Sequence, residues 1–583
     1  MTETKSERRA AMQFARGAYW YFLFWGVCSA LGTTFSTLID AILVGNLVGS
    51  DGLAVTSIAT PVFLFYALLG MTLGVGANVK IGRALGSDHV EEANRIFHEV
   101  LLTGVLVGAL CLAVVLPLRE RMLDLLGAED ALRPLARQYL TVVFGSAPVF
   151  VLYHILANTV RTDSDPKLAA ASSAVVVVFN LSLDILFMQG FKWGIVGASS
   201  ALCIAETLGL VVLLFHFARK SASLRLRLRL PGWADLRAFV GNGFGVGSAF
   251  IFQGVVMFTF NTLLLASDRA NGVTYVAIFG VIYTMSTIPA AIFDGAGNAI
   301  STVASIFTGE RDSESILVTM RLGLKIVLAG GALVGTVFVV FAPQLMRFFG
   351  IAEPAVLAMA VPAVRLYSVC LLFMGVNVLS TAFWQAIGRA KLASAMSLVR
   401  NFVLMMVLGG ILISRLHMTG LSLTYVLTEG LCLAGVGIVH MVSGSPAYVT
   451  RKFGLSGKNY EKVYTISTDS INEIANDLEQ LCDAWEIDYK KAFFIHLMVE
   501  ELILNIIKFG LKDTSRQRSI AIKLMENGDE IILRIRDNVH TYNPFEAGDG
   551  DEIDNAVINL ITKKTQFYNY QRKLIFNYLY LIL

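Results

Sequence analysis

Residues 179–206 read FNLSLDILFMQGFKWGIVGASSALCIAE. Two apolar runs flank a short glycine-containing turn, and the first run carries Asn180 and Asp184. A helix needs about 20 mostly apolar residues to cross the hydrocarbon core of a bilayer. Extended to residues 168–189 and 194–217, both runs reach that length. The stretch therefore predicts two consecutive membrane-spanning helices, with a carboxylate inside the first of them.

The composition of the whole chain agrees with a membrane protein. Of its 583 residues, 55% are hydrophobic and 16% are charged, and the mean hydropathy is +0.64. Soluble domains carry about 25% charged residues, so we expect most of this chain to lie in a bilayer. The net charge of +3 is too small to indicate nucleic acid as a partner. The six cysteines have no paired spacing that would indicate a metal site or a disulfide framework.

Twelve segments are long and apolar enough to span a bilayer. They are centred on residues 18–45, 53–80, 96–117, 133–160, 168–189, 194–217, 241–267, 273–307, 318–342, 355–387, 392–414 and 417–443. Lys and Arg in short loops mark the cytoplasmic side. The loop at residues 218–232 is strongly basic, and so is the N-terminal tail. We therefore expect a multi-pass protein of the cell membrane (plasma or inner membrane) with both termini in the cytoplasm.

The chain contains an internal repeat. Identical residues recur at an offset of 223, in the pairs Gly86 and Gly309, Gly127 and Gly350, Gly197 and Gly420, and Glu206 and Glu429. Six spans would then occur twice, and an even number of spans returns each repeat to the same side of the membrane. We expect two parallel six-helix bundles, related by a pseudo-two-fold axis along the membrane normal, with a cavity between them.

Two aspartates lie inside predicted spans, where a carboxylate is costly unless it faces protein or water. Asp40 and Asp184 each stand about five residues before the outer end of a span, and Tyr139 enters at a similar depth. Asn180 is four residues before Asp184 and shares its helix face. We expect Asp40, Tyr139, Asn180 and Asp184 to form a cation-coupling site, for either H⁺ or Na⁺. The alternative is that both aspartates only cap helix ends.

The second half lacks an equivalent of this cluster. Asn401 corresponds to Asn180, but Met405 stands in place of Asp184. The coupling chemistry is therefore expected in the first half. Other polar residues within the spans are candidates for the cavity wall, namely Glu206, Gln253, Asp294, Arg400 and Glu429. For the two glutamates, a structural role between helices is the alternative.

Three stretches resemble the MATE (multidrug and toxin extrusion) family of the MOP flippase superfamily in order and spacing. They are IDAILVGNLVGSDGLAV (39–55), LGMTLGVGANVKIGRALGSDHVEEANR (69–95) and residues 179–206. The resemblance covers about residues 15–445. It implies an all-α polytopic fold and export of organic cations or other amphipathic small molecules, driven by inward H⁺ or Na⁺.

The family also implies site residues. One branch places its cation site on an Asp in helix 1, a Tyr in helix 4, and an Asn and an Asp in helix 5. These positions match Asp40, Tyr139, Asn180 and Asp184 here. Another branch uses a Glu in helix 7 and an Asp in helix 10, where this sequence has Gln253 and WQAIGRAK (384–391). That departure disfavours a cation site in the second half.

The last part of the chain reads as a soluble α+β domain. KKAFFIHLMVEELILNIIKFG (490–510) predicts an amphipathic helix, and SIAIKLMENGDEIILRIRDN (519–538) predicts two strands joined by a turn. The domain resembles the histidine-kinase-type (GHKL) ATPase fold, in particular the anti-sigma-factor serine kinases. Glu501 and Asn505 match that family's E-x-x-x-N helix, which binds Mg²⁺, and Asp537 matches the Asp that reads adenine.

Two departures weaken the expectation of Mg-ATP binding. Val539 replaces the glycine of the family's D-x-G motif, and IDNAVINLITKK (553–564) replaces its glycine-rich lid. Backbone amides cradle phosphates only where the chain can approach closely, which glycine permits. We therefore expect a degenerate regulatory module that contacts a regulatory protein, with an active serine kinase as the alternative.

The sequence thus predicts four regions: bundles at 1–222 and 223–443, a linker at 444–459, and the ATPase-like domain at 460–583. The predicted function is cation-coupled efflux by a secondary transporter that is not an enzyme. The alternative is a flippase for lipid-linked precursors or polysaccharides, which should have a strongly cationic cavity for pyrophosphate. Arg400, Lys325 and Arg365 are the candidates for such a cavity.

Overall fold

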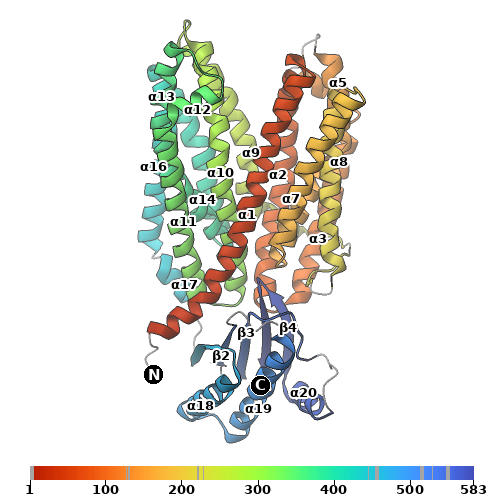
Figure 1. Ribbon diagram of the computed structural model, residues 1–583, viewed down its shortest axis with the longest axis vertical. Helices are drawn as coiled ribbons and strands as arrows, with labels where there is room; N and C mark the ends of the chain where they lie inside the picture. The colour runs from red at the N-terminus through yellow and green to blue at the C-terminus, as the bar shows by residue number, and fades with distance from the viewer. Residues whose placement is uncertain are drawn as a thin grey trace.

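The computed structural model describes residues 5–126, 128, 132–219, 222–227, 229–443, 445–453, 458–511, 518–527, 530–545 and 552–583. It consists of a long helical part and a smaller domain with a β-sheet at one end (Figure 1). The two ends of the helical part are called the domain-side end and the far end below.

The first half contains α1 (Lys5–Leu47), α2 (Ser50–Gly86), α3 (Val90–Val115), α4 (Arg119–Leu125), α5 (Arg133–Gly145), α6 (Ala147–Thr162), α7 (Pro166–Asp184), the π-helix η1 (Ile185–Gly190), α8 (Ile195–Leu214) and the 3₁₀ helix η2 (Phe215–Ala218). The helices α5 and α6 form one span that bends by 49° at Ser146. Pro148, near the start of α6, cannot donate a backbone hydrogen bond and so favours this bend.

The second half contains α9 (Trp233–Ser267), α10 (Gly272–Gly309), α11 (Ser313–Val340), α12 (Ala342–Phe348), α13 (Pro354–Ser368), α14 (Cys370–Ala386), α15 (Ala390–Leu398), the π-helix η3 (Val399–Val403) and α16 (Leu404–Ser443). The described residues contain ten helices apolar enough to cross a membrane, or eleven with the bent pair. The last, Ala390–Val442, is two helices joined by a kink at His417 (φ 52°, ψ −124°). Each predicted span thus has a helix in its place.

The repeat is visible in the backbone. The short helices α4 and α12 begin and end 223 residues apart. Asp88 (φ 63°) and Arg311 (φ 55°) take the same left-handed conformation at that offset, and so do Gly194 (φ 55°) and His417 (φ 52°). Such conformations are rare outside glycine, so their recurrence at one spacing identifies equivalent turns in the two halves.

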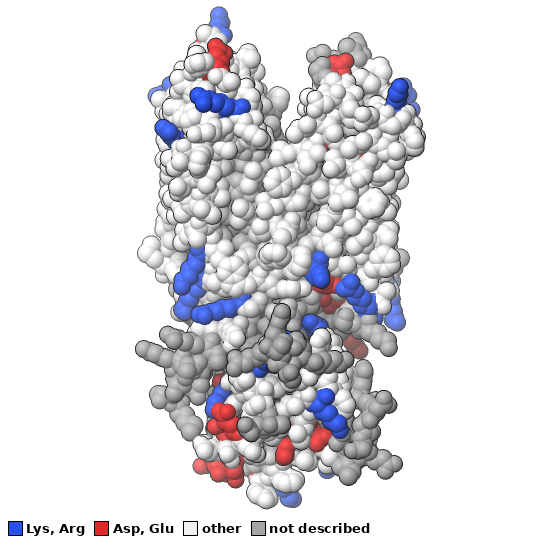
Figure 2. Space-filling model, viewed as in Figure 1, with Lys and Arg blue, Asp and Glu red and all other residues white. Residues whose placement is uncertain are grey.

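The two halves form lobes that separate toward the far end. In Figure 1 the lobe with α11 to α16 and the lobe with α3 to α8 diverge away from the sheet domain. Figure 2 shows a groove between them at the far end and, on the face in view, an uncharged band of the helical part that is bounded by charged residues at both ends. That band has the character expected of a surface in contact with lipid hydrocarbon.

At the domain-side end the lobes meet backbone to backbone. A Cβ added to Gly86 would collide with the Ile306 carbonyl and would lie 3.0 Å from the Gly309 Cα. Gly86 and Gly309 are repeat equivalents, so the pseudo-two-fold axis passes between α2 and α10 at this contact. Residues 86–89 and 309–312, which end these helices and turn into the next ones, are called the two gate turns below.

The chain then forms α17 (Ser445–Phe453), within the predicted linker, with Val449 and Phe453 buried in the core of the second half. The sheet domain follows with β1 (Asn459–Thr465), α18 (Thr468–Ala484), α19 (Tyr489–Asn505), the π-helix η4 (Ile506–Gly510), β2 (Ser519–Asn527), β3 (Glu530–Asp537), α20 (Glu552–Lys564), β4 (Phe567–Lys573) and β5 (Phe576–Ile582). Its antiparallel sheet has the order β1-β2-β3-β5-β4. The predicted hairpin of β2 and β3 is confirmed, while the hairpin of β4 and β5 was not predicted.

The sheet domain has its own core, in which α18 and α19 cover the sheet on the side away from the membrane helices (Figure 1). Ile520, Ile522 and Leu524 alternate along β2 toward these helices and are fully buried. The opposite face of the sheet is turned toward the gate turns. The tip of the β4–β5 hairpin therefore reaches the helical part, where Leu574 is fully buried.

We predict that Gly309→Val weakens closure at the domain-side end. The added side chain must displace the Arg83 carbonyl, and overpacking of this kind costs about 1–3 kcal/mol. Spin labels at Leu125 and Phe348, exposed repeat equivalents at the far end, report the separation of the lobes. In a background without native cysteines, pulsed electron resonance should show a larger population with a short label-to-label distance.

The matched control is Gly330→Val, because no atom lies within 4 Å of a Cβ at Gly330. It should leave the distance distribution unchanged. An unchanged distribution in Gly309→Val as well would contradict the role of this contact.

Candidate functional site

The four residues predicted for cation coupling come from three helices of the first half. Asp40 lies on α1, Tyr139 on α5, and Asn180 and Asp184 on α7. The Asn180 side-chain amide donates to Asp184 Oδ2 at 3.2 Å, and the Asp40 carboxyl interacts with both residues. Asp184 is fully buried, while Asn180 and Tyr139 are 3% exposed. The structure thus brings Asp40, Asn180 and Asp184 together, and Tyr139 is close enough to feel the charge of both carboxyl groups.

The local fold of α7 exposes Asp184 to this cluster. The regular helix ends at Asp184, and the π-helix Ile185–Gly190 begins directly after it. A π-helical turn widens the backbone spiral and is frequent at functional sites. A small cavity lined by Ser36, Asp40, Asn180 and Asp184 lies between α1 and α7.

The cluster is chemically suited to a small cation. Two carboxyl groups in contact inside protein cannot both stay charged unless a cation lies between them. No side-chain ammonium or guanidinium of the described residues makes an ion pair with Asp40 or Asp184. Two buried side-chain oxygens, Asp184 Oδ1 and Asn180 Oδ1, have no hydrogen-bond partner among the described residues. A shared proton or a Na⁺ ion would satisfy these oxygens.

A second cavity, of about 270 Å³, lies between the lobes. Its wall includes three of the predicted cavity residues, Gln253 on α9, Asp294 on α10 and Arg400 on η3. Gln253 donates to the Tyr283 hydroxyl at 2.9 Å. Asp294 is the acidic residue of this wall, which also contains Asn298 and Ser301. These follow Asp294 by four and seven residues, a helical spacing that would have identified this polar face from the sequence.

The two predicted glutamates lie elsewhere. Glu429 is buried in the second half, where it forms an ion pair with Arg400 at 2.8 Å and accepts from the Asn377 amide at 2.7 Å. Asn377 was not singled out by the sequence. Glu206 lines neither cavity, and its Oε2 has no partner among the described residues. The interhelical role fits Glu429, and the cavity wall does not include either glutamate.

Two further cations considered for the cavity are outside it. Lys325 on α11 is exposed on the surface of the helical part, and Arg365 donates to the Val339 carbonyl at 3.1 Å. Neither is part of the cavity wall. Arg400 is thus the cation in this wall, and Glu429 neutralises it.

In the sheet domain, the nucleotide candidates are engaged with one another or with neighbours. The Asn505 amide donates to Glu501 at 3.3 Å, and Asn505 is buried. Asp537 ends β3, is 1% exposed, and accepts hydrogen bonds from the Val539 amide at 3.0 Å and the Asn577 side chain at 2.8 Å. Burial raises the pKa of Asp537 from 3.8 to about 6.

The surroundings of these residues do not fit Mg-ATP. The Val539 side chain packs into the domain core against Gly510. The segment in place of the lid is helix α20, whose Ile558 and Ile561 are part of the same core. Residues that fill the core cannot present a phosphate cradle of backbone amides.

Comparisons with known proteins support the membrane part. The family model MatE matches residues 27–186 and 248–411, more than half of the chain. The multidrug export protein MepA of Staphylococcus aureus is 25% identical over 427 residues, which cover 71% of this chain and 91% of MepA. MepA of Staphylococcus saprophyticus is 24% identical over 411 residues, covering 70% and 89%.

Solved structures share the fold. A multidrug resistance MATE family transporter of the MOP superfamily in an outward-facing conformation aligns with a TM-score of 0.69 and 21% identity, covering 77% of this chain and 100% of its own. A MOP superfamily transporter from Pyrococcus furiosus, described as having a binding pocket of reverse polarity, aligns with a TM-score of 0.68, 21% identity and coverages of 77% and 99%.

We predict that Asp537 makes the stability of the sheet domain fall as pH rises from about 4 to about 6. The folded protein holds the proton more tightly than the unfolded chain, so folding is favoured below the folded pKa and loses about 3 kcal/mol once Asp537 ionises. Asp537→Asn should remove this loss and raise the thermal transition of the domain at pH 8. Calorimetry of the full chain between pH 4 and 8 measures it, and an equal pH slope in the variant would contradict the assignment.

Proposed function

The chain belongs to the MatE family, and on that premise we propose that it is a secondary transporter that exports amphipathic organic cations in exchange for H⁺ or Na⁺. The observation that carries this proposal is the cluster of Asp40, Asn180 and Asp184, in which the half-buried Asp40 and the fully buried Asp184 interact without a basic partner among the described residues. A carboxylate pair inside a membrane protein is costly unless it exchanges an ion.

The charge of the central cavity supports a cationic substrate. The Arg400 and Glu429 charges cancel in their ion pair, which leaves the Asp294 carboxylate as the net charge of the wall. The remaining wall contains Met71, Phe250 and small apolar residues that suit an amphipathic molecule. A flippase for pyrophosphate-linked lipids would need excess positive charge, which this wall lacks among the described residues.

The helix α1 supplies a mechanical link between the two sites. It carries Asp40 near the far end and packs on α10 at Gly26, where a Cβ would lie 3.0 Å from the Gly295 carbonyl. Gly295 directly follows Asp294 of the cavity wall. We propose that binding of H⁺ or Na⁺ at Asp40 and Asp184 allows α1 to shift against α7 and α10. That shift changes the surroundings of Asp294 and releases the substrate through the groove at the far end.

We further propose that the domain-side end faces the cytoplasm, in the cell membrane. The basic loop at residues 218–232 follows α8 at this end, as the positive-inside rule requires. The lobes are in contact here and separated at the far end. With this orientation the structure is outward-facing, the state that loads the coupling ion and releases the substrate.

For the sheet domain we propose a regulatory role in a degenerate GHKL-type fold. The support is the pairing of Glu501 with Asn505 on one helix and Asp537 at the end of a central strand. Val539 and two isoleucines of α20 are part of the domain core in place of a glycine and a glycine-rich lid, so we assign the domain no catalytic step.

We predict that Asp184→Asn abolishes gradient-driven uptake of a fluorescent organic cation into inside-out vesicles. The variant cannot release a proton or balance Na⁺ at the pair, so no gradient energy reaches the substrate. Uptake under an imposed pH gradient and then under a Na⁺ gradient identifies the ion that drives the wild type. Uptake that survives in the variant would contradict the coupling assignment.

Glu206→Gln is the matched control, because Glu206 is an intramembrane acid of the same half outside both cavities. It should retain uptake. Absence of uptake by the wild type under both gradients would contradict export of organic cations and favour the flippase.

A further inference from the structure

The sheet domain touches the first gate turn through a buried ion pair. Lys573, the last residue of β4, lies 2.7 Å from Asp88 Oδ1, and the side chains are 3% and 6% exposed. The same ammonium donates to the Gly86 carbonyl at 3.2 Å. Lys573 therefore binds both the side chain and the backbone of the turn that ends α2.

The domain touches the second gate turn from β3, the strand on the other side of β5. On β3, Arg536 lies 3.6 Å from Asp312, each side chain being 8% exposed, and Arg534 donates to the Glu310 carbonyl at 2.9 Å. Burial by itself raises the pKa of Asp312. The positive charges of Lys523 and Arg536 lower it by a larger amount, so the net shift of this pKa is downward. The second gate turn thus carries a carboxylate held ionised by cations of the domain.

Apolar contacts fill the space between these two attachments. Leu574 and Phe576 belong to the core of the helical part and are 0% and 4% exposed. The Phe576 ring packs edge-on against the Phe14 ring of α1, with 4.9 Å between the ring centroids. The Leu574 amide donates to Ser164 at 2.8 Å, in the turn before α7. The hairpin tip is therefore seated across the seam between the halves.

Opening of the domain-side end is incompatible with this seat. Alternating access requires the lobes to separate at Gly86 and Gly309, which now touch. One rigid sheet holds both gate turns, because β4 and β3 are bonded through β5. If the turns move apart, either the contacts of Lys573 or those of Arg534 and Arg536 must break. We propose that the sheet domain is a clamp that ties the two gate turns together and holds the transporter outward-facing until it is released.

The clamp goes beyond the proposed regulatory role by specifying what the domain controls, and its test needs no substrate. Spin labels at Leu125 and Phe348 again report the distance between the lobes at the far end. Truncation after residue 457 removes the domain, and the truncated chain keeps residues 27–186 and 248–411, which the MatE family model matches. We expect the population with a short far-end distance to rise severalfold in the truncated chain and in Lys573→Glu, and to stay at the wild-type value in Lys573→Arg.

The control is Lys563→Glu, which reverses an exposed charge on α20 away from the gate turns. It should behave as the wild type. If Lys573→Glu unfolds the domain, it will match the truncated chain, and the truncation alone decides. Distance distributions that are unchanged after truncation overturn the clamp, whether or not the chain exports organic cations.

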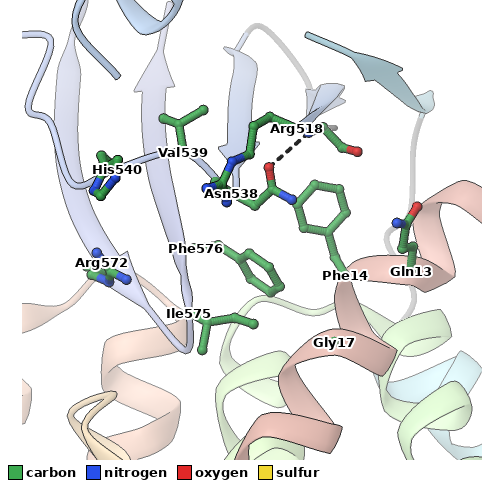
Figure 3. A pocket seen from close by; sticks show the side chains of 11 residues that line it. Gln13, Phe14, Gly17, Arg518, Asn538, Val539, His540, Arg572, Ile575 and Phe576 are labelled. Carbon is green, nitrogen blue, oxygen red and sulfur yellow. Dashed lines mark hydrogen bonds between the residues drawn. The ribbon is translucent and has the colours of Figure 1, made fainter. Parts of the chain in front are cut away.

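An independent observation concerns a cavity of about 400 Å³ in the joint between α1 and the domain (Figure 3). Its polar wall contains Arg518, Arg572 and His540, together with Asn538, and Phe14 and Phe576 form its apolar wall. No carboxylate belongs to the described lining. Arg518 donates to the Asn538 carbonyl at 2.8 Å, and Arg572 donates to Thr541.

Each guanidinium has five N–H donors, so both retain donors for a ligand. Neither arginine forms an ion pair with a carboxylate of the described residues. Arginines bind phosphate groups through paired charge-assisted hydrogen bonds, and the cavity volume is within the range of small-ligand pockets. We infer that this cavity binds a phosphate-bearing anion, either a soluble one or the headgroup of an anionic lipid, which joins α1 to the domain.

Thermal unfolding of the lipid-depleted full chain tests this site. Inorganic pyrophosphate probes a soluble anion, and short-chain phosphatidylglycerol, compared with phosphatidylcholine, probes a lipid headgroup. A rise in the transition temperature with pyrophosphate supports the soluble source, and a rise with phosphatidylglycerol alone supports the lipid. Either rise should be lost in Arg518→Gln/Arg572→Gln and kept in Lys563→Gln/Lys564→Gln, which removes two exposed charges from the same domain. No rise with either probe, or a rise kept in the arginine variant, overturns the site.

Discussion

The contact between α2 and α10 at Gly86 and Gly309 sets the state of the whole helical part. With no side chain between the two backbones, the lobes close at this end, and the divergence of their helices opens the groove at the other end. Because the two glycines are repeat equivalents, the contact lies on the pseudo-two-fold axis. A single small contact therefore controls both lobes at once, and a domain that binds beside it can control the transporter.

The two halves handle buried charge in different ways. In the second half, Arg400, Glu429 and Asn377 satisfy one another, so the pair adds no net charge. In the first half, Asp40 and Asp184 meet without a cation among the described residues. A low-dielectric interior tolerates the first arrangement permanently and the second only with a proton or a bound ion. This asymmetry is what an exchange site requires, and it arises in a fold whose backbone is otherwise repeated.

The sheet domain buries its core on one face of the sheet and meets the membrane helices with the other. Glu501 and Asn505 are bonded to each other on one helix, and Val539, Ile558 and Ile561 belong to the domain core. The face of the sheet that meets the membrane helices carries Lys573, Arg534 and Arg536, and all three contact the gate turns. The face of the sheet opposite α18 and α19 is thus the binding surface for the rest of the chain.

The sequence by itself determined the membrane spans from their apolar length and the repeat from the offset of 223. It also indicated that Asp40 and Asp184 of the first half lie at a similar depth. All three are local or periodic properties of the chain. The sequence also predicted the β2–β3 hairpin from its alternation. It could not predict that Glu429 forms an ion pair with Arg400 or accepts a hydrogen bond from Asn377, because these partners come from separate helices. The β4–β5 hairpin and its seat on the gate turns were decided only by tertiary structure. A buried ion pair such as Lys573 with Asp88 joins residues 485 apart, and no local pattern records which charges will be desolvated together.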